Sequence, residues 1–280
     1  MISGLDHIVA LVGDIGKGAA AYEALLGCAP SWQNHGDGAD RVLFTLSNMT
    51  LELMAPSGFS VAADRIRHVI NRSGEGLASI CFRTGDIGRM HRRLDRLALK
   101  PEPVAEVESS DSVSGRSLRW KRTRASTDAT RGVRLFFLEL DGERPRAKAT
   151  ADAPVTGLDH VVVSTGDSDR AAALYGARLG LDMALDRTHQ DWGQLMFFRC
   201  GDVIVEVVRR PVAGGDAHHD KLWGLSWRVA DIDAARARLL EAGIDVSDAR
   251  TGRKPGTRVM TVRSGTCGVQ TLFLERTPRD

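Results

Sequence analysis

The sequence predicts an α+β protein built from four βαβββ units that form two tandem domains. The first observation behind this prediction is a long internal repeat, which places one half of the chain over the other. The second is a fainter repeat inside each half. The third is the order of hydrophobic periods, which runs from strand to helix to strands in every copy. We expect the first domain at residues 1–143 and the second at residues 155–278.

The long repeat begins each half. The stretch LDHIVALVGDI aligns with LDHVVVSTGDS, which lies 153 residues further along the chain. The only two tyrosines of the protein coincide in this alignment, so the halves are related. The aligned pairs include His7 with His160, Asp14 with Asp167, Tyr22 with Tyr175 and Gly27 with Gly180. Between the halves, residues 141–156 are rich in Pro, Ala and charge, and we predict a linker there.

The fainter copies are GLASICFRTGDI, which begins at Gly76, and WGLSWRVADI, which begins at Trp223. Every copy ends in an aspartate that leads into a helical pattern, where a carboxylate can accept the free amide hydrogens of the first turn. We therefore predict helix N-caps at Asp14, Asp86, Asp167 and Asp231. The expected units are residues 4–57, 74–142, 157–210 and 221–277.

The rest of each unit predicts strands. Alternating apolar runs are separated by turn residues, as in RVLFTL followed by TLELMAP and LMFFRC followed by VIVEVV. The second and fourth units repeat this arrangement with SLRWKR before VRLFFLEL and RVMTVR before VQTLFLE. These runs complete the βαβββ pattern.

The composition narrows the class of protein. Of 280 residues, 42% are apolar and 26% are charged, which is typical of a globular protein. No apolar run is long enough to span a bilayer, and the N-terminus lacks the pattern of a secretory signal. The four cysteines show no zinc-like spacing and are expected to be reduced thiols. We therefore expect a cytoplasmic protein that does not bind membranes.

Basic residues gather in two stretches, between Arg116 and Arg134 and between Arg250 and Arg263. Two interpretations stay open: a solvated face of the strands, or a site for the carboxylate or phosphate of a small ligand. Nucleic acid is not expected as a partner, because the net charge is only +2 and the remaining charges are balanced. A monomer and a homodimer are both compatible with the sequence.

The four strand-to-helix stretches quoted above, with the strand-end glutamates in TLELMAP, VIVEVV, FFLEL and TLFLE, resemble the vicinal oxygen chelate superfamily. This superfamily holds glyoxalases, bleomycin-resistance proteins and extradiol dioxygenases. The resemblance covers nearly the whole chain, and it implies that paired units curl into cup-shaped mixed sheets whose inner faces carry the sites.

The resemblance also implies where metal ligands should lie, in the first and last strands of the units. Carried over by position, the ligands are His160, Glu206 and Glu275 in the second half and His7, Glu52 and Glu139 in the first. The same four glutamates are the candidate catalytic acids and bases. One imidazole and two carboxylates suit Zn, Ni, Mn, Fe or Co.

The sequence departs from active relatives at the second histidine of each half, where Ser79 and Gly224 stand. Histidines elsewhere could substitute, namely His35, His189, His218 and His219. A metal site and a site that has lost its metal are therefore both open at this point.

For substrate binding, the aromatic residues expected to line a cup are Trp192, Trp223 and Trp227, and Arg258 is expected to meet an anionic part of a small-molecule ligand. Three functions follow: a metal-dependent lyase or isomerase of glyoxalase type, a metal-free protein that binds a drug, toxin or metabolite, and an extradiol-type dioxygenase. The cleaner strand spacing favours a site in the second half.

Overall fold

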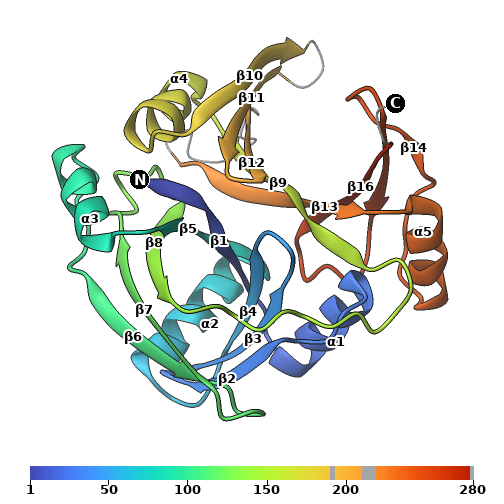
Figure 1. Cartoon of the computed structure of the whole chain (residues 1–280), viewed down its shortest axis with the longest axis horizontal. Coiled ribbons are helices and arrows are strands. Elements are labelled where there is room, and N and C mark those ends of the chain that lie inside the picture. Colours follow the sequence, from blue (N-terminus) through green and yellow to red (C-terminus); the bar gives the residue numbers. More distant parts are fainter. Residues whose placement is uncertain (190–192, 210–218, 278–280) are drawn as a thin grey trace.

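The computed structural model describes residues 1–189, 193–209 and 219–277, which form two eight-stranded sheets (Figure 1). The first half contains β1 (Ile2–Leu11), α1 (Ile15–Leu26), β2 (Trp32–Gly36), β3 (Ala39–Thr45), β4 (Thr50–Pro56), α2 (Val61–Ser73), β5 (Gly76–Thr84), α3 (Ile87–Arg96), β6 (Ala105–Ser110), β7 (Ser117–Arg124) and β8 (Arg134–Asp141). The second half contains β9 (Val155–Thr165), α4 (Ser168–Ala172) with a π-helical continuation (Ala173–Arg178), β10 (Asp182–His189), β11 (Gly193–Cys200), β12 (Val203–Arg209), β13 (Lys221–Val229), α5 (Ile232–Glu241), β14 (Arg250–Thr251), β15 (Thr257–Val262) and β16 (Gln270–Arg276).

Each sheet joins two βαβββ units at its centre. In the first sheet the strand order is β2-β3-β4-β1-β5-β8-β7-β6, with β1 antiparallel to β5. In the second sheet β9 and β13 hold the same central places. The leading strand of every unit pairs in parallel with the last strand of its own unit. The predicted α+β fold of four units in two tandem, cup-shaped sheets is therefore confirmed.

The predicted N-caps are also confirmed. The carboxylates of all four aspartates accept hydrogen bonds from backbone amides in the first turn of the helix that follows. Each cap residue has an extended backbone, so the chain turns from strand into helix at that residue. The residues concerned are Asp14, Asp86, Asp167 and Asp231.

Helix α2 joins the first two units and lies outside the four strand-to-helix junctions that the repeats predict. Ser60 caps it, and Ala63 is its one buried residue. A helix with so small an apolar contact lies on the surface.

The two edges of the first sheet are joined to each other. The Trp32 indole nitrogen of β2 donates to the Ser109 hydroxyl of β6 at 3.2 Å, and the Asn34 amide donates to the Ser110 carbonyl at 3.0 Å. Beyond β6, the Asp111 carboxylate accepts from the Gln33 backbone amide at 2.8 Å. These bonds nearly close the first sheet into a barrel.

The inside of that barrel has a small apolar cluster of its own. Trp32, Leu43 and Leu118 are buried there, with Trp120 packed against them, and this cluster is separate from the main core. In the second sheet, by contrast, one edge strand (β10) is exposed along most of its length and the other (β14) has only two residues. Figure 1 shows these two edges standing apart, so the second sheet is the open one.

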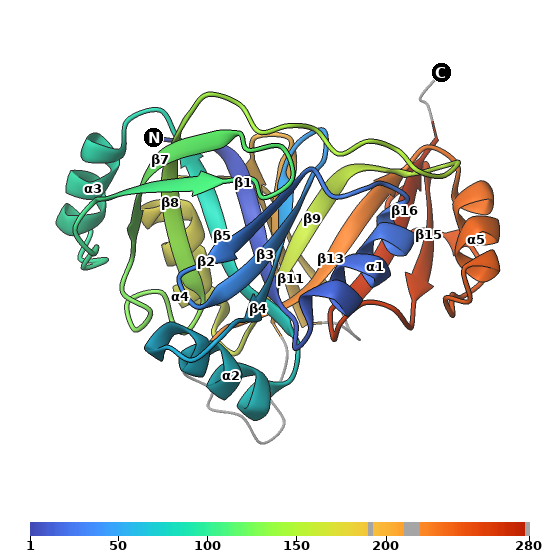
Figure 2. The same ribbon diagram turned by 90° about the horizontal axis from the view of Figure 1, so that it is seen from below.

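Two arginines of the second half bind helix ends of the first half. Arg238 of α5 donates to the carbonyls of Ala24 and Leu25 at the C-terminal end of α1, and Arg178 donates to the carbonyl of Leu97, at 2.7 Å, just after α3. Unpaired carbonyls end every helix, so a guanidinium there satisfies acceptors that would otherwise be left without donors. Between the sheets, β13 contacts β5 and β1 contacts β11 (Figures 1 and 2).

Among the helices of the described residues, we find none with the length and apolar character needed to cross a bilayer.

We expect Arg238→Ala to lower the free energy of unfolding by about 1–3 kcal/mol, because two carbonyls at the end of α1 lose their donors. The measurement is urea denaturation followed by circular dichroism. Arg263→Ala is the control: Arg263 is exposed and pairs with the exposed Asp245, so its loss should cost less than about 1 kcal/mol. Equal effects from the two variants would contradict a special role for Arg238.

Candidate functional site

A β-bulge at the start of each half sets the geometry of the inner face. In β1, Leu5 lies opposite Phe82 and His7 lies opposite Cys81, so Asp6 is an extra residue without an opposite partner. A bulge re-aims side chains and lets two consecutive residues approach each other. The same shift occurs in β9, where Leu158 lies opposite Trp227 and His160 lies opposite Ser226, which leaves Asp159 as the extra residue.

The bulged aspartate binds the histidine that follows it. Nδ1 of His7 lies 2.7 Å from an Asp6 carboxylate oxygen, and Nδ1 of His160 lies 3.0 Å from an Asp159 oxygen. Because the carboxylate accepts the Nδ1 proton, the other ring nitrogen, Nε2, is left to meet groups on the inner face. Neither aspartate was expected at the site from the sequence, although the signal was present: each directly precedes its histidine inside a strand.

Arginines keep both aspartates ionised. Arg144 lies 2.6 Å from Asp6, which is fully buried, while Arg228 (3.2 Å) and Arg276 both contact Asp159. Burial acts to raise the pKa of each carboxyl, but the neighbouring histidine and the arginines outweigh burial and hold both pKa values well below the usual range. The two carboxylates are therefore permanent anions at neutral pH.

In the second half, His160 meets two further groups. Its Nε2 lies 2.7 Å from the Ser226 hydroxyl of β13 and 3.1 Å from a Glu206 carboxylate oxygen of β12. Glu206 is 14% exposed and His160 is 16% exposed, so both groups can be reached from solvent while remaining largely desolvated. The structure thus brings together two of the three residues expected here, His160 and Glu206, and adds Asp159 and Ser226.

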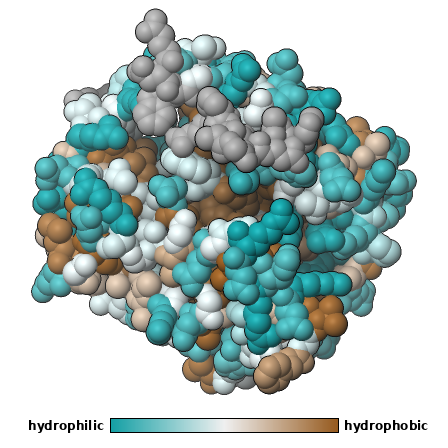
Figure 3. Space-filling view, turned by 180° about the vertical axis from the view of Figure 1, so that it is seen from behind, coloured by the Kyte–Doolittle hydropathy of each residue, from teal (hydrophilic) through white to brown (hydrophobic). Residues whose placement is uncertain are grey.

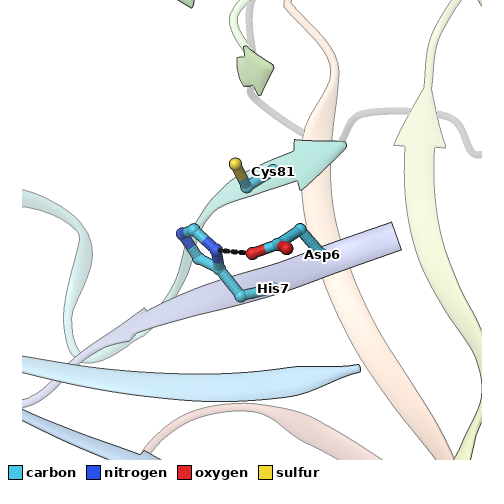
Figure 4. Close-up of side chains that lie close together, drawn as sticks. All are labelled: Asp6, His7 and Cys81. Atoms are coloured by element: carbon cyan, nitrogen blue, oxygen red, sulfur yellow. Dashed lines mark hydrogen bonds and ion pairs between the residues drawn. The ribbon is translucent and has the colours of Figure 1, made fainter. Parts of the chain in front are cut away.

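In the first half, His7 meets Glu52 and Cys81. Nε2 of His7 lies 3.6 Å from a Glu52 oxygen, and Arg41 draws the other oxygen of Glu52 to 3.5 Å. Figure 4 shows the Cys81 thiol on the same side of the sheet as the imidazole. Burial would lower the pKa of His7, but Cys81 and Asp6 outweigh it and raise that pKa, while burial raises the pKa of the Cys81 thiol.

The structure corrects the expected role of Glu139. Its carboxylate lies on the helix-facing side of β8, where it accepts a hydrogen bond from the backbone amide of Ile87 at 2.7 Å, at the start of α3. The place on β8 that corresponds to Glu52 is Phe136, which lies opposite Cys81 as Glu52 lies opposite Val9. Glu139 follows three residues later, and an odd step along a strand turns the side chain to the other face.

Glu275 is displaced in the same way. It faces α5, where Arg258 lies 3.5 Å from Glu275 and 2.6 Å from Asp233. The place that corresponds to Glu206 is Leu272, opposite Ser226. Arg258, expected to bind an anionic ligand, is therefore engaged with carboxylates on the outer side of the sheet.

The missing second histidine has a structural cause in the second half. A Cβ at Gly224 would come within 2.6 Å of the Gln270 carbonyl oxygen on β16, which is closer than side chains are found to approach backbone. No larger residue fits unless β16 moves. Ser79, its counterpart in the first half, is buried on the inner face opposite Val9.

The other candidates are dispersed. Trp227 is fully buried in the main core and does not line the inner face, which corrects the expectation for this residue, whereas Trp223 is 37% exposed. Trp192 and His218 lie outside the described residues. Among the substitute histidines, His35 pairs with Asp40 at 2.9 Å on the β2–β3 hairpin, and His219 lies beside Gly132 of the first half.

One face of the molecule is hollowed, with a hydrophobic floor and a largely hydrophilic border (Figure 3). A concave apolar surface with a few convergent polar groups is typical of a site for a small molecule. With the paired cups and the histidine–carboxylate clusters, this surface places the protein in the class of βαβββ proteins that bind or transform small molecules.

Comparison with known families agrees with that class. The family model described as "Glyoxalase-like domain" matches residues 5–175, and the model described as "Glyoxalase/Bleomycin resistance protein/Dioxygenase superfamily" matches residues 159–261. The first match spans more than half of the chain. The chain therefore belongs to the glyoxalase-like domain family, within the vicinal oxygen chelate superfamily.

Solved structures show the same fold across the whole chain. A mutant of 4-hydroxymandelate synthase from Streptomyces coelicolor has a TM-score of 0.69 at 14% identity, covering 100% of this chain and 94% of that one. A hypothetical protein from Staphylococcus aureus has 0.66 at 10% identity, covering 96% and 98%, and BphC, a halotolerant catechol dioxygenase, has 0.63 at 12% identity, covering 100% and 89%. At these identities the likeness concerns the fold alone. Comparison with curated proteins gives no match.

Stability in acid should depend on Asp6. Its pKa in the folded state lies below the value of about 3.9 for an unfolded chain, so ionised Asp6 stabilises the fold above about pH 4 and this contribution is lost as the pH falls toward the folded value. We expect Asp6→Asn to lower the free energy of unfolding by about 3 kcal/mol at pH 7, since Arg144 loses its buried partner.

The difference in the free energy of unfolding between wild type and Asp6→Asn should become smaller below about pH 4. Urea denaturation across a pH series would measure it. The control is Asp64→Asn, because Asp64 is exposed and its loss should change little at any pH. A gap that stays constant down to about pH 3 would show that the charge of Asp6 is not what stabilises the fold.

Proposed function

We propose that the protein is a small-molecule lyase or isomerase of glyoxalase type, with its reacting groups in the second half. The observation that supports this proposal is the cluster of Asp159, His160 and Glu206, in which Nε2 lies 3.1 Å from a carboxylate oxygen on the inner face of an open sheet. An oriented imidazole next to a carboxylate is suited both to metal binding and to proton transfer.

The donor set fits a divalent metal. Two ligand atoms that each lie about 2.1 Å from one ion are separated by roughly 3 Å, which is close to the separation of Nε2 and the Glu206 oxygen. His160 and Glu206 would hold the ion, and these donors suit Mn, Fe, Co, Ni or Zn. When bound, the metal supplies Lewis-acid polarisation of substrate oxygens.

The chain's own residues supply orientation and proton transfer. Asp159 holds the Nδ1 proton, which keeps the Nε2 lone pair directed at the inner face. Arg228 and Arg276 keep Asp159 ionised and so preserve this tautomer. The Glu206 carboxylate is the group placed to accept a proton from a substrate carbon next to a carbonyl.

The second half is the better candidate for two reasons. In the first half Arg41 lies 3.5 Å from one oxygen of Glu52, and the other oxygen lies 3.6 Å from Nε2 of His7, farther than the 3.1 Å between Glu206 and His160. The first sheet is also nearly closed around its apolar cluster, whereas the two edge strands of the second sheet stand apart.

A metal-free binding protein is the second candidate, and one contact favours it. The Ser226 hydroxyl lies 2.7 Å from Nε2 of His160 and can donate to it, which satisfies the imidazole without a metal. A ring-cleaving dioxygenase has less support, because the two-histidine, one-carboxylate set lacks its second histidine at Gly224.

Titration with Mn²⁺, followed by the electron paramagnetic resonance of the free ion, tests the proposal. We expect Glu206→Gln to weaken the affinity of the second-half site by at least about tenfold, since one of its two main donors is lost. Glu275→Gln is the matched control, a glutamate of the same half that faces α5, and it should bind as wild type does.

The amount bound decides between the two candidates. Uptake below about a tenth of an equivalent by wild type, with no gain on reconstitution with Zn²⁺ or Ni²⁺, would leave metal-free binding as the function.

A further inference from the structure

Two guanidinium groups lie over one aromatic ring inside the first sheet. Phe136 of β8 lies opposite Cys81, at the place on the inner face that a glutamate holds on β4. On the neighbouring strand β7, the guanidinium carbon of Arg122 lies 5.7 Å from the centre of the Phe136 ring, and that of Arg124 lies 5.8 Å from it. Cation–π contacts at these distances hold both side chains against the inner face.

A third arginine lies on the same face. Arg134 precedes Phe136 by two residues in β8, and side chains two residues apart along a strand point to the same side. All three arginines come from the basic stretch between Arg116 and Arg134, for which a solvated face and an anion site were both open. The pairing of β7 with β8 places them inside the first sheet, beside Phe136.

The charge of this group is not balanced by acidic residues. Arg124 pairs with Glu102, but in the part of the chain that the structure describes neither Arg122 nor Arg134 has a carboxylate partner. Arg122 is exposed and Arg134 is half-buried, so an anion can reach them from solvent. Guanidinium groups that share one surface repel one another, and a bound anion offsets that repulsion.

The second half shows that the fold itself does not require these arginines. Its inner face carries uncharged residues at all the corresponding places. The strand register matches Arg122 with Val259, Arg124 with Thr261, Arg134 with Gln270 and Phe136 with Leu272. The cationic group is therefore particular to the first half.

An apolar surface adjoins the arginines. Trp120 precedes Arg122 by two residues on the same face of β7, and it is only partly buried. Its ring packs against the buried cluster of Trp32, Leu43 and Leu118. A ligand that binds beside Arg122 can therefore rest an apolar part on the Trp120 ring.

We propose that the inner face of β7 and β8 binds a small organic anion, a carboxylate or phosphate monoester with an apolar body. Arg122 and Arg134 bind the head group, because a guanidinium offers paired donors that match two oxygens of either anion. Phe136 supports the guanidinium of Arg122, and Trp120 contacts the apolar body. The site uses none of the residues proposed to react in the second half, so it does not depend on that function.

Isothermal titration calorimetry with phenyl phosphate tests the proposal on the full-length protein, freed of metal by a chelator. Wild type should bind one equivalent, and benzyl alcohol, a neutral probe of similar size, should bind at least about tenfold more weakly. Arg122→Gln should weaken the binding of phenyl phosphate by at least about tenfold, because the head group loses a charged pair of donors. Its circular dichroism should match that of wild type, since Arg122 is exposed, and Arg134→Gln serves as a second variant.

Arg119→Gln is the matched control. Arg119 also lies on β7, but on the outer face, where it pairs with Glu108 at 3.3 Å, so this variant should bind as wild type does. The proposal would be overturned by the absence of saturable binding up to about 10 mM phenyl phosphate, by equal affinity for benzyl alcohol, or by equal losses in the Arg122 and Arg119 variants. Any of these results would leave the arginines as a cover for the apolar cluster.

Two further measurements separate this proposal from the one for the second half. Glu206→Gln should leave the binding of phenyl phosphate unchanged, and Arg122→Gln should leave the Mn²⁺ titration unchanged. Loss of phenyl phosphate binding in Glu206→Gln would place the anion in the second half and overturn the site on β7 and β8.

Discussion

The hydrogen bond from the histidine ring to the bulged aspartate is the contact on which both inner faces depend. It requires the extra residue in β1 and β9, because without the bulge the aspartate would point to the opposite side of the sheet from its neighbour. It also requires an ionised carboxylate in a buried place, which the arginines around Asp6 and Asp159 provide. In each half, the β-bulge, the ion pair between aspartate and arginine and the orientation of the histidine ring therefore depend on one another.

Around that shared unit the halves have diverged. The first sheet is joined edge to edge, carries an apolar cluster inside and places Arg41 on its glutamate. The second sheet keeps its edges apart and leaves Glu206 facing His160. The same fold therefore presents one enclosed set of donors and one accessible set.

The sequence predicted the parts that depend on local pattern. The helix caps follow from a short polar side chain at the start of a helix, and the unit order follows from hydrophobic periods, so both could be read without a structure. The site could be predicted only in part, because it depends on strand register. His160 and Glu206 meet as expected. Glu275 lies three residues beyond the corresponding position, Leu272, so its side chain is on the other face of the strand and faces α5. Cys81 and Ser226 could not be found, because only the pairing of β1 with β5 and of β9 with β13 sets them opposite the histidines.

The arginines that cross between the halves bear on how a duplicated protein can evolve. Arg238 serves a helix of the first half and Arg178 serves the end of another, while Arg131 and the buried Asp220 form an ion pair between the halves. Polar groups in each half therefore depend on hydrogen-bond or ion-pair partners in the other half. A half separated from its partner would leave the carbonyls at the ends of α1 and α3 without these donors and the buried Asp220 without Arg131, so the two halves are expected to be retained together.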